Sequence, residues 1–142
     1  MTTIKVKGNF SRLRSRIIKK DKGFNKFLLS TAFLLNSKIQ RRVQQRGFGV
    51  KGKMPLYKSK AYRSFRRKRG REITKRDLTF TGRMWQSVSA IIRTSRKQAI
   101  MFFGGVEENR KAFFNDKRTP FFGLNSSEKA FLDKRLKDFG KL

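Results

Sequence analysis

A regular stripe of apolar residues constrains the fold of this chain more than any other feature. Apolar side chains recur every three or four positions across residues 24–46, at Phe24, Leu28, Ala32, Leu35, Ile39 and Val43. This period predicts an amphipathic helix about 35 Å long. Such a helix is long for a chain of 142 residues, which suits a single domain. We expect the stripe to pack in the core, and it could also extend into a neighbouring subunit.

A glycine-rich stretch follows the predicted helix at residues 47–54, with the sequence GFGVKGKM. It fits the dinucleotide pattern G-x-G-x-x-G, and it fits the P-loop pattern except that Met54 replaces the final Ser or Thr. Both patterns need a strand before the glycines and a helix after them. Here a helix precedes the glycines, and Pro55 disfavours helical geometry at Met54. We therefore interpret Gly47 as the left-handed end of the helix and the remainder as the start of a mobile loop.

Residues 47–76 form a segment that we call the basic arm. It contains a possible short helix over about residues 59–67, broken at Gly70, and one acid, Glu72. The run of basic residues has three interpretations: contact with a polyanion, docking on an acidic protein, or plain solvation. The candidate binding residues are Lys58, Lys60, Arg63, Arg66, Arg67, Lys68, Arg69, Arg71, Lys75 and Arg76. We expect that Ser at all four positions from Arg66 to Arg69 would leave the fold intact.

The remaining segments complete one domain over residues 1–142. Residues 1–23 suggest a short strand and a short basic helix, and residues 77–106 suggest a hairpin with strands at 88–93 and 99–103. Residues 107–142 contain one helical turn at 107–113 and a C-terminal helix at about 126–139, opened by a capping box from Asn125 to Glu128. The predicted fold is α+β. A small antiparallel sheet of about three or four strands has the long N-terminal helix packed across it, together with the C-terminal helix.

The charge balance points to an anionic partner. The chain has 38 basic and 9 acidic residues, a formal net charge of +29, and 25 of the basic residues fall within residues 1–76. Repulsion on this scale opposes a compact state unless an anion neutralises it. Fifteen Phe residues nevertheless indicate a packed core rather than a disordered tail.

The composition is poor in groups for catalysis. The chain has no Cys and no His, which removes thiolate ligands and the commonest base near neutral pH. Glu107 and Glu108 are adjacent, and neighbours on a helix diverge by about 100°. We therefore expect no enzyme activity, no catalytic residue, no metal and no cofactor. The sequence also shows neither a signal peptide nor an apolar run of ~20 residues, so we expect a soluble protein without membrane contact.

The order of three motifs resembles the tail-completion, or virion-morphogenesis, family of tailed bacteriophages. The motifs are KGKMPLYKS at residues 51–59, LTFTGRMWQSV at 78–88 and RTPFFGL at 118–124. They are similar to the family's Met-Pro-Leu loop, its L-x-x-T-G-x-L-x-x-S segment and its R-x-F-L-G segment, and the likeness covers roughly residues 24–139. The positions that match the family are Thr81, Gly82, Ser87, Arg118, Phe121 and Gly123.

The resemblance implies a structural role in the phage neck. Members form rings that join the tail to the head around the DNA channel, here with about six or twelve copies. It implies synthesis in the host cytoplasm, localisation in the virion, acidic neck, tail or adaptor proteins as neighbours, and matching residues that are architectural. Double-stranded DNA could be contacted through its phosphates without sequence specificity. The alternative is a monomeric, sequence-non-specific nucleic-acid-binding protein of ribosomal or nucleoid type.

Overall fold

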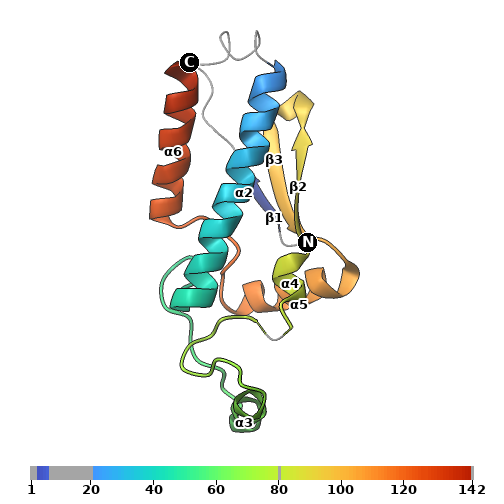
Figure 1. Cartoon of the computed structure of the whole chain (residues 1–142), viewed down its shortest axis with the longest axis vertical. Coiled ribbons are helices and arrows are strands. Elements are labelled where there is room, and N and C mark those ends of the chain that lie inside the picture. The colour runs from blue at the N-terminus through green and yellow to red at the C-terminus, as the bar shows by residue number, and fades with distance from the viewer. Residues whose placement is uncertain (1–2, 7–20, 80, 142) are drawn as a thin grey trace.

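The protein has an α+β fold in which one long helix lies against a small antiparallel sheet (Figure 1). The computed structural model describes residues 3–6, 21–79 and 81–141. The short basic helix predicted within residues 1–23 falls mostly outside these residues. The elements are β1 (Thr3–Val6), α2 (Asp21–Arg46), α3 (Lys60–Lys68), α4 (Arg83–Gln86), β2 (Val88–Arg93), a 3₁₀ turn (Thr94–Arg96), β3 (Gln98–Phe103), α5 (Val106–Arg118) and α6 (Ser126–Lys141).

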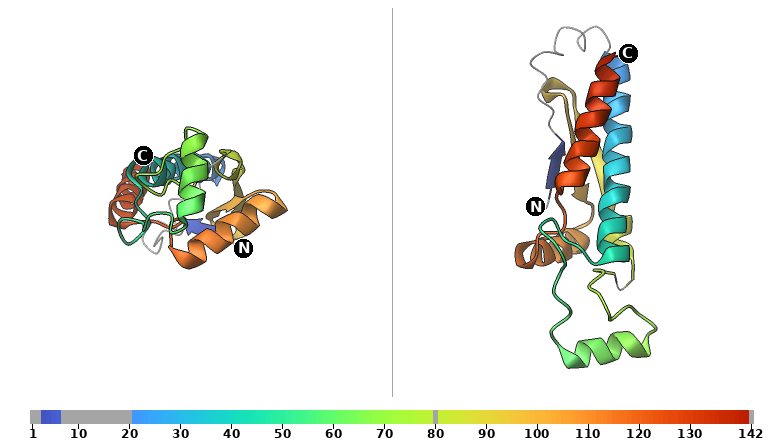
Figure 2. Two further views of the ribbon diagram at one scale, coloured as in Figure 1. Left: turned by 90° about the horizontal axis from the view of Figure 1, so that it is seen from below. Right: turned by 90° about the vertical axis from the view of Figure 1, so that its left-hand side faces the viewer.

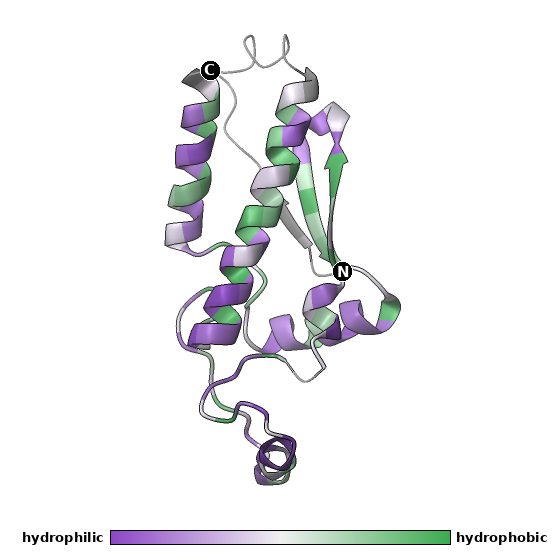
Figure 3. Ribbon diagram, in the orientation of Figure 1, coloured by the Kyte–Doolittle hydropathy of each residue, from purple (hydrophilic) through white to green (hydrophobic). Residues whose placement is uncertain are grey.

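The apolar stripe of α2 forms the centre of the core. All six residues of the predicted stripe are 0% exposed, and α2 contacts β2 and β3 on one side and α6 on another. Figure 3 shows hydrophobic residues along the strands and spaced along α2, whereas α3 is largely hydrophilic. The prediction of a long helix in the core is therefore confirmed, although the helix begins at residue 21 rather than at residue 24.

The sheet has the strand order β1-β3-β2, and both pairings are antiparallel. The predicted hairpin is confirmed, with Val88 opposite Phe103 and Arg93 opposite Gln98. Lys97 closes the turn in a left-handed conformation, with φ of 49°. Among the described residues the sheet is smaller than the upper expectation of four strands, and residues 77–79 have no regular secondary structure.

The glycine-rich stretch after α2 is a tight, packed hairpin. Gly47 has φ of 67° and donates its N–H to the Val43 carbonyl at 2.9 Å, which confirms it as the end of the helix. The next residues do not start a loose loop, because Phe48 pairs with Lys53 and the Val50 N–H donates to the Pro120 carbonyl at 2.8 Å. The backbone N–H groups of Gly47, Phe48, Gly49, Val50 and Met54 are thus bonded to the protein's own carbonyls.

The C-terminal region contains two helices. α5 runs from Val106 to Arg118 and is much longer than the single turn expected at residues 107–113. The capping box of α6 is confirmed, because the Asn125 side chain accepts from the Glu128 N–H and the Glu128 carboxylate accepts from the Asn125 N–H, both at 2.9 Å. This reciprocal pair satisfies two backbone donors at the helix start.

A candidate anion-binding arm

The basic arm carries α3 beyond the end of the body formed by the other elements (Figures 1 and 2). α3 begins where the Ser59 hydroxyl accepts the Tyr62 N–H at 3.1 Å, and the chain turns back at Gly70 with φ of 63°. Arg66, Arg67 and Lys68 occupy the last turn, where cations interact favourably with the helix dipole. The predicted short helix at residues 59–67 is confirmed within one residue at each end.

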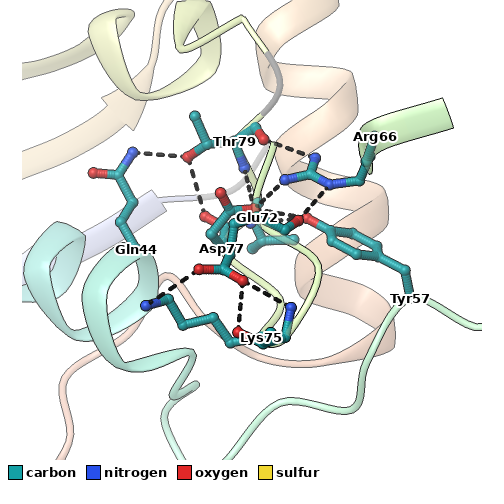
Figure 4. A network of polar contacts seen from close by, with 9 residues as sticks. Gln44, Tyr57, Arg66, Glu72, Lys75, Asp77 and Thr79 are labelled. Carbon is teal, nitrogen blue, oxygen red and sulfur yellow. Dashed lines mark hydrogen bonds and ion pairs between the residues drawn. The ribbon is translucent and has the colours of Figure 1, made fainter. Parts of the chain in front are cut away.

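Arg66 is the internal anchor of the arm rather than part of its surface. The residue is 0% exposed. Its Nε donates to the Glu72 carbonyl at 2.9 Å, its Nη1 to the Thr79 carbonyl at 2.8 Å and its Nη2 to Asp77 Oδ1 at 2.8 Å (Figure 4). The expectation that Arg66 binds a polyanion is therefore wrong, because its guanidinium is buried and bonded on all three nitrogens. For the same reason, a fourfold substitution that includes Arg66 would disturb the fold.

Asp77 is the polar centre of this network. Its Oδ1 accepts from the Tyr57 hydroxyl at 2.9 Å and from the Thr79 N–H at 3.1 Å, in addition to Arg66. Burial first, and then the charge of Asp77, raise the pKa of Tyr57 well above its ordinary value. Gln44 donates to the Thr79 hydroxyl at 2.8 Å and connects the network to α2. The base of the arm is therefore fixed to the long helix.

The backbone at Leu78 is strained to allow this arrangement. Leu78 has φ of 54°, an uncommon conformation for a residue other than glycine. Its N–H donates to the Tyr57 hydroxyl at 3.2 Å. The Leu78 backbone is therefore held by Tyr57 from the outgoing limb of the arm, and Leu78 is not part of a strand.

The other nine candidate cations lie on or near the surface of the arm. Arg63, Lys75 and Arg76 are partly buried, and Lys75 lies 3.6 Å from the Glu72 carboxylate. Tyr62 and Phe65 are exposed among the cations of α3, and the Arg69 guanidinium lies 5.1 Å from the centre of the Phe65 ring. The fully exposed members are Lys58, Lys60, Arg67, Lys68, Arg69 and Arg71. This cationic surface can contact phosphates or carboxylates.

Four of the six positions that match the phage family lie at the ends of α4 or are packed against other residues. Gly82 has φ of 81° before α4, and the Ser87 carbonyl accepts the Gly104 N–H at 2.7 Å. Phe121 is 0% exposed, and a Cβ on Gly123 would lie 3.0 Å from Val50. The two remaining positions, Thr81 and Arg118, are exposed.

Sequence reasoning missed the role of Arg42. Its guanidinium is buried and donates to Glu128 Oε2 at 2.7 Å, and to the carbonyls of Phe121 and Gly123 at 2.8 and 3.0 Å. Burial lowers the pKa of Arg42, and the charge of Glu128 opposes this effect. From the sequence, Arg42 is only a cation near the end of a helix. Its partner Glu128 is distant in the sequence, so no local pattern indicates the pair.

Among the described residues, no three acidic side chains gather as a metal site, and no helix is both long enough and apolar enough to cross a bilayer. No family model, curated protein or solved structure matches this chain.

Proposed function

We propose that this protein is a structural subunit of a phage neck or tail-completion ring, and that its basic arm contacts an anionic surface in that assembly. The observation that carries the proposal is the projection of α3 from the body, held at its base by the buried Arg66. The arm places six exposed cations on a short helix and its flanks, away from the body, and Arg66 fixes that helix to the core. Preorganised binding surfaces lose less conformational entropy on association than flexible tails do.

The order of the three family-like motifs supports the phage context. The charge of +29 supports an assembly with DNA or acidic proteins, because repeating such a subunit around a ring requires neutralisation. The proposed ring has about six or twelve copies, and its expected location is the head–tail junction of the virion. A structural role without enzyme activity is part of the proposal.

A second candidate function is sequence-non-specific nucleic-acid binding by a monomer. The exposed rings of Tyr62 and Phe65 among the cations of α3 favour it, because aromatic side chains stack on unpaired bases. The two candidates differ in assembly state and in preference for single strands.

Antibody labelling of purified virions tests the proposal directly. Density at the neck is the expected result, and its absence from the particles would overturn the phage function. A triple variant with Ser at Arg67, Lys68 and Arg69 should yield heads and tails that fail to join, as seen by electron microscopy. The matched control replaces Lys129, Lys134 and Lys137, which are exposed on α6, with Ser and should assemble normally.

Duplex binding of the purified protein separates the two candidates. The monomeric candidate predicts tighter binding to single-stranded than to duplex DNA, and the neck subunit predicts at most weak, salt-sensitive duplex binding. If the arm makes the contacts, the triple arm variant should reduce the slope of log K against log salt by up to about 3, because each lost phosphate contact removes about 0.9.

A further inference from the structure

A cationic cleft lies behind the exposed face of the arm. Its volume is about 730 Å³, and its walls come from the outgoing limb of the arm and the C-terminal end of α5. Lys58, Arg76 and Arg118 line it, and none of the described residues that line it is Asp or Glu. The cleft therefore concentrates positive charge without an internal counter-ion.

Arg76 is the recessed cation of this cleft. Its Nη2 donates to the Asn115 side-chain oxygen at 2.8 Å, and its Nη1 makes a longer bond of 3.5 Å to the Thr119 hydroxyl. Its Nε is buried and has no hydrogen-bond partner among the described residues, which is also true of Arg42 Nε. Burial lowers the pKa of Arg76, and the nearby charge of Arg118 lowers it further.

Two buried arginines differ from Arg76 in having a carboxylate partner. Arg42 and Arg66 each contact a carboxylate, at 2.7 and 2.8 Å, whereas no carboxylate of the described residues pairs with Arg76. Because partly desolvated charges in proteins are normally paired, this arrangement indicates an anion supplied from outside the chain.

The surroundings of Arg76 favour a carboxylate over a DNA phosphate. The rings of Tyr57 and Tyr62 and the apolar side chain of Leu56 line the same cleft. A recess of this volume accommodates a short peptide segment, and Arg and Tyr are typical of protein interfaces. The convex backbone of a duplex would instead meet the exposed cations of α3.

We infer that this cleft binds a carboxylate side chain within an acidic, partly apolar peptide segment of a protein partner. The guanidinium of Arg76 would supply the recessed contact, with Arg118 and Lys58 at the rim. Arginine recognises planar carboxylates through charge-assisted hydrogen bonds. The inference deepens the proposed function and rests on it, because it assigns the inner cations to a neighbouring acidic protein and leaves the outer ones for DNA.

Peptide binding to the purified full chain tests this inference. The probe is a fluorescently labelled peptide of alternating Glu and Leu, and the control peptide has Gln in place of Glu. Arg118→Gln and Arg76→Gln should each weaken binding of the acidic peptide about tenfold, whereas Arg67→Gln, an equal charge change on α3, should have less than a twofold effect. For binding to duplex DNA, Arg67→Gln should have a larger effect than Arg118→Gln or Arg76→Gln. The side chain of Arg118 is exposed and makes no hydrogen bond to a described residue, so Arg118→Gln should retain the melting temperature.

Three outcomes would overturn the inference: equal binding of the two peptides, equal effects of Arg118→Gln and Arg67→Gln on peptide affinity, or a larger effect of Arg118→Gln on duplex DNA than on the peptide. The neck function is judged separately by labelling of virions. Neck density without selective peptide binding would remove only the inference, and selective binding without neck density would remove only the phage function.

Discussion

The Nη2 of Arg66 lies 2.8 Å from Oδ1 of Asp77, in an ion pair that closes the base of the basic arm. Arg66 lies on α3 within the arm, Asp77 directly follows the arm's last residue, and the Tyr57 ring packs 4.6 Å from the Arg66 guanidinium. Asp77, which follows the long basic run, thus pairs with one arginine of that run, Arg66. The orientation of α3 relative to the body depends on this ion pair.

Arg66→Met should destabilise the fold by about 3–5 kcal/mol, because it leaves Asp77 as a buried charge without its partner. The free energy of unfolding from urea denaturation is the measurement. The double variant Arg66→Met with Asp77→Asn should recover part of the loss, since removal of both charges avoids an unpaired carboxylate.

Arg67→Met provides the matched control for this prediction. Arg67 is the next residue along α3 and is exposed, so its replacement should change stability by less than about 0.5 kcal/mol. Equal losses for the two single variants would contradict the assignment of Arg66 as the anchor.

Local patterns predicted the elements whose burial follows a period, and they failed where burial depends on distant partners. The stripe of α2 and the apolar residues of the hairpin are visible in the sequence because these residues form the core or pack against it. Arg66 and Arg67 are equivalent in the sequence. They differ in the structure because the chain turns back at Gly70 and brings Asp77 to Arg66. The length of α5 was missed because Phe113 and Phe114 are exposed and Ala112 is its buried residue, which leaves no apolar stripe.

Glu128→Ala should destabilise the protein by about 3–5 kcal/mol, because Arg42 would keep a buried charge without a carboxylate. Asn125→Ala removes only the other half of the capping box and should cost about 1 kcal/mol. Urea denaturation of both variants measures the difference. Equal losses would mean that the Arg42 pair adds nothing beyond the cap.

The stability of the turn after α3 should depend on pH through the Glu72 carboxylate. Its carboxylate accepts from the Thr74 hydroxyl and N–H at 2.6 and 2.7 Å, and these bonds lower the pKa of Glu72 from 4.5 to about 2. Because the folded pKa lies below the unfolded one, the stabilisation is complete above about pH 4.5 and is lost as the pH falls towards 2. An NMR titration of the Glu72 carboxyl measures this value.

Thr74→Val is the matched variant for the Glu72 titration. It removes the hydroxyl donor and keeps the backbone N–H, so the pKa of Glu72 should rise towards its ordinary value without reaching it. An unchanged pKa in this variant would show that the Thr74 hydroxyl does not act on Glu72.

Gly49→Ala should destabilise the fold by about 1–3 kcal/mol, because the glycine-rich hairpin packs against the segment that precedes α6. A Cβ at Gly49 would lie 2.6 Å from the Pro120 carbonyl oxygen, so one of the two backbones would have to move. Gly23→Ala is the matched control, since a Cβ there meets nothing within 4 Å on α2 and Ala should stabilise that helix by up to about 1 kcal/mol. Melting temperatures should therefore shift in opposite directions for the two variants. A loss of stability in both would contradict the account of Gly49, because it would indicate that the effect comes from replacing any glycine rather than from this close approach.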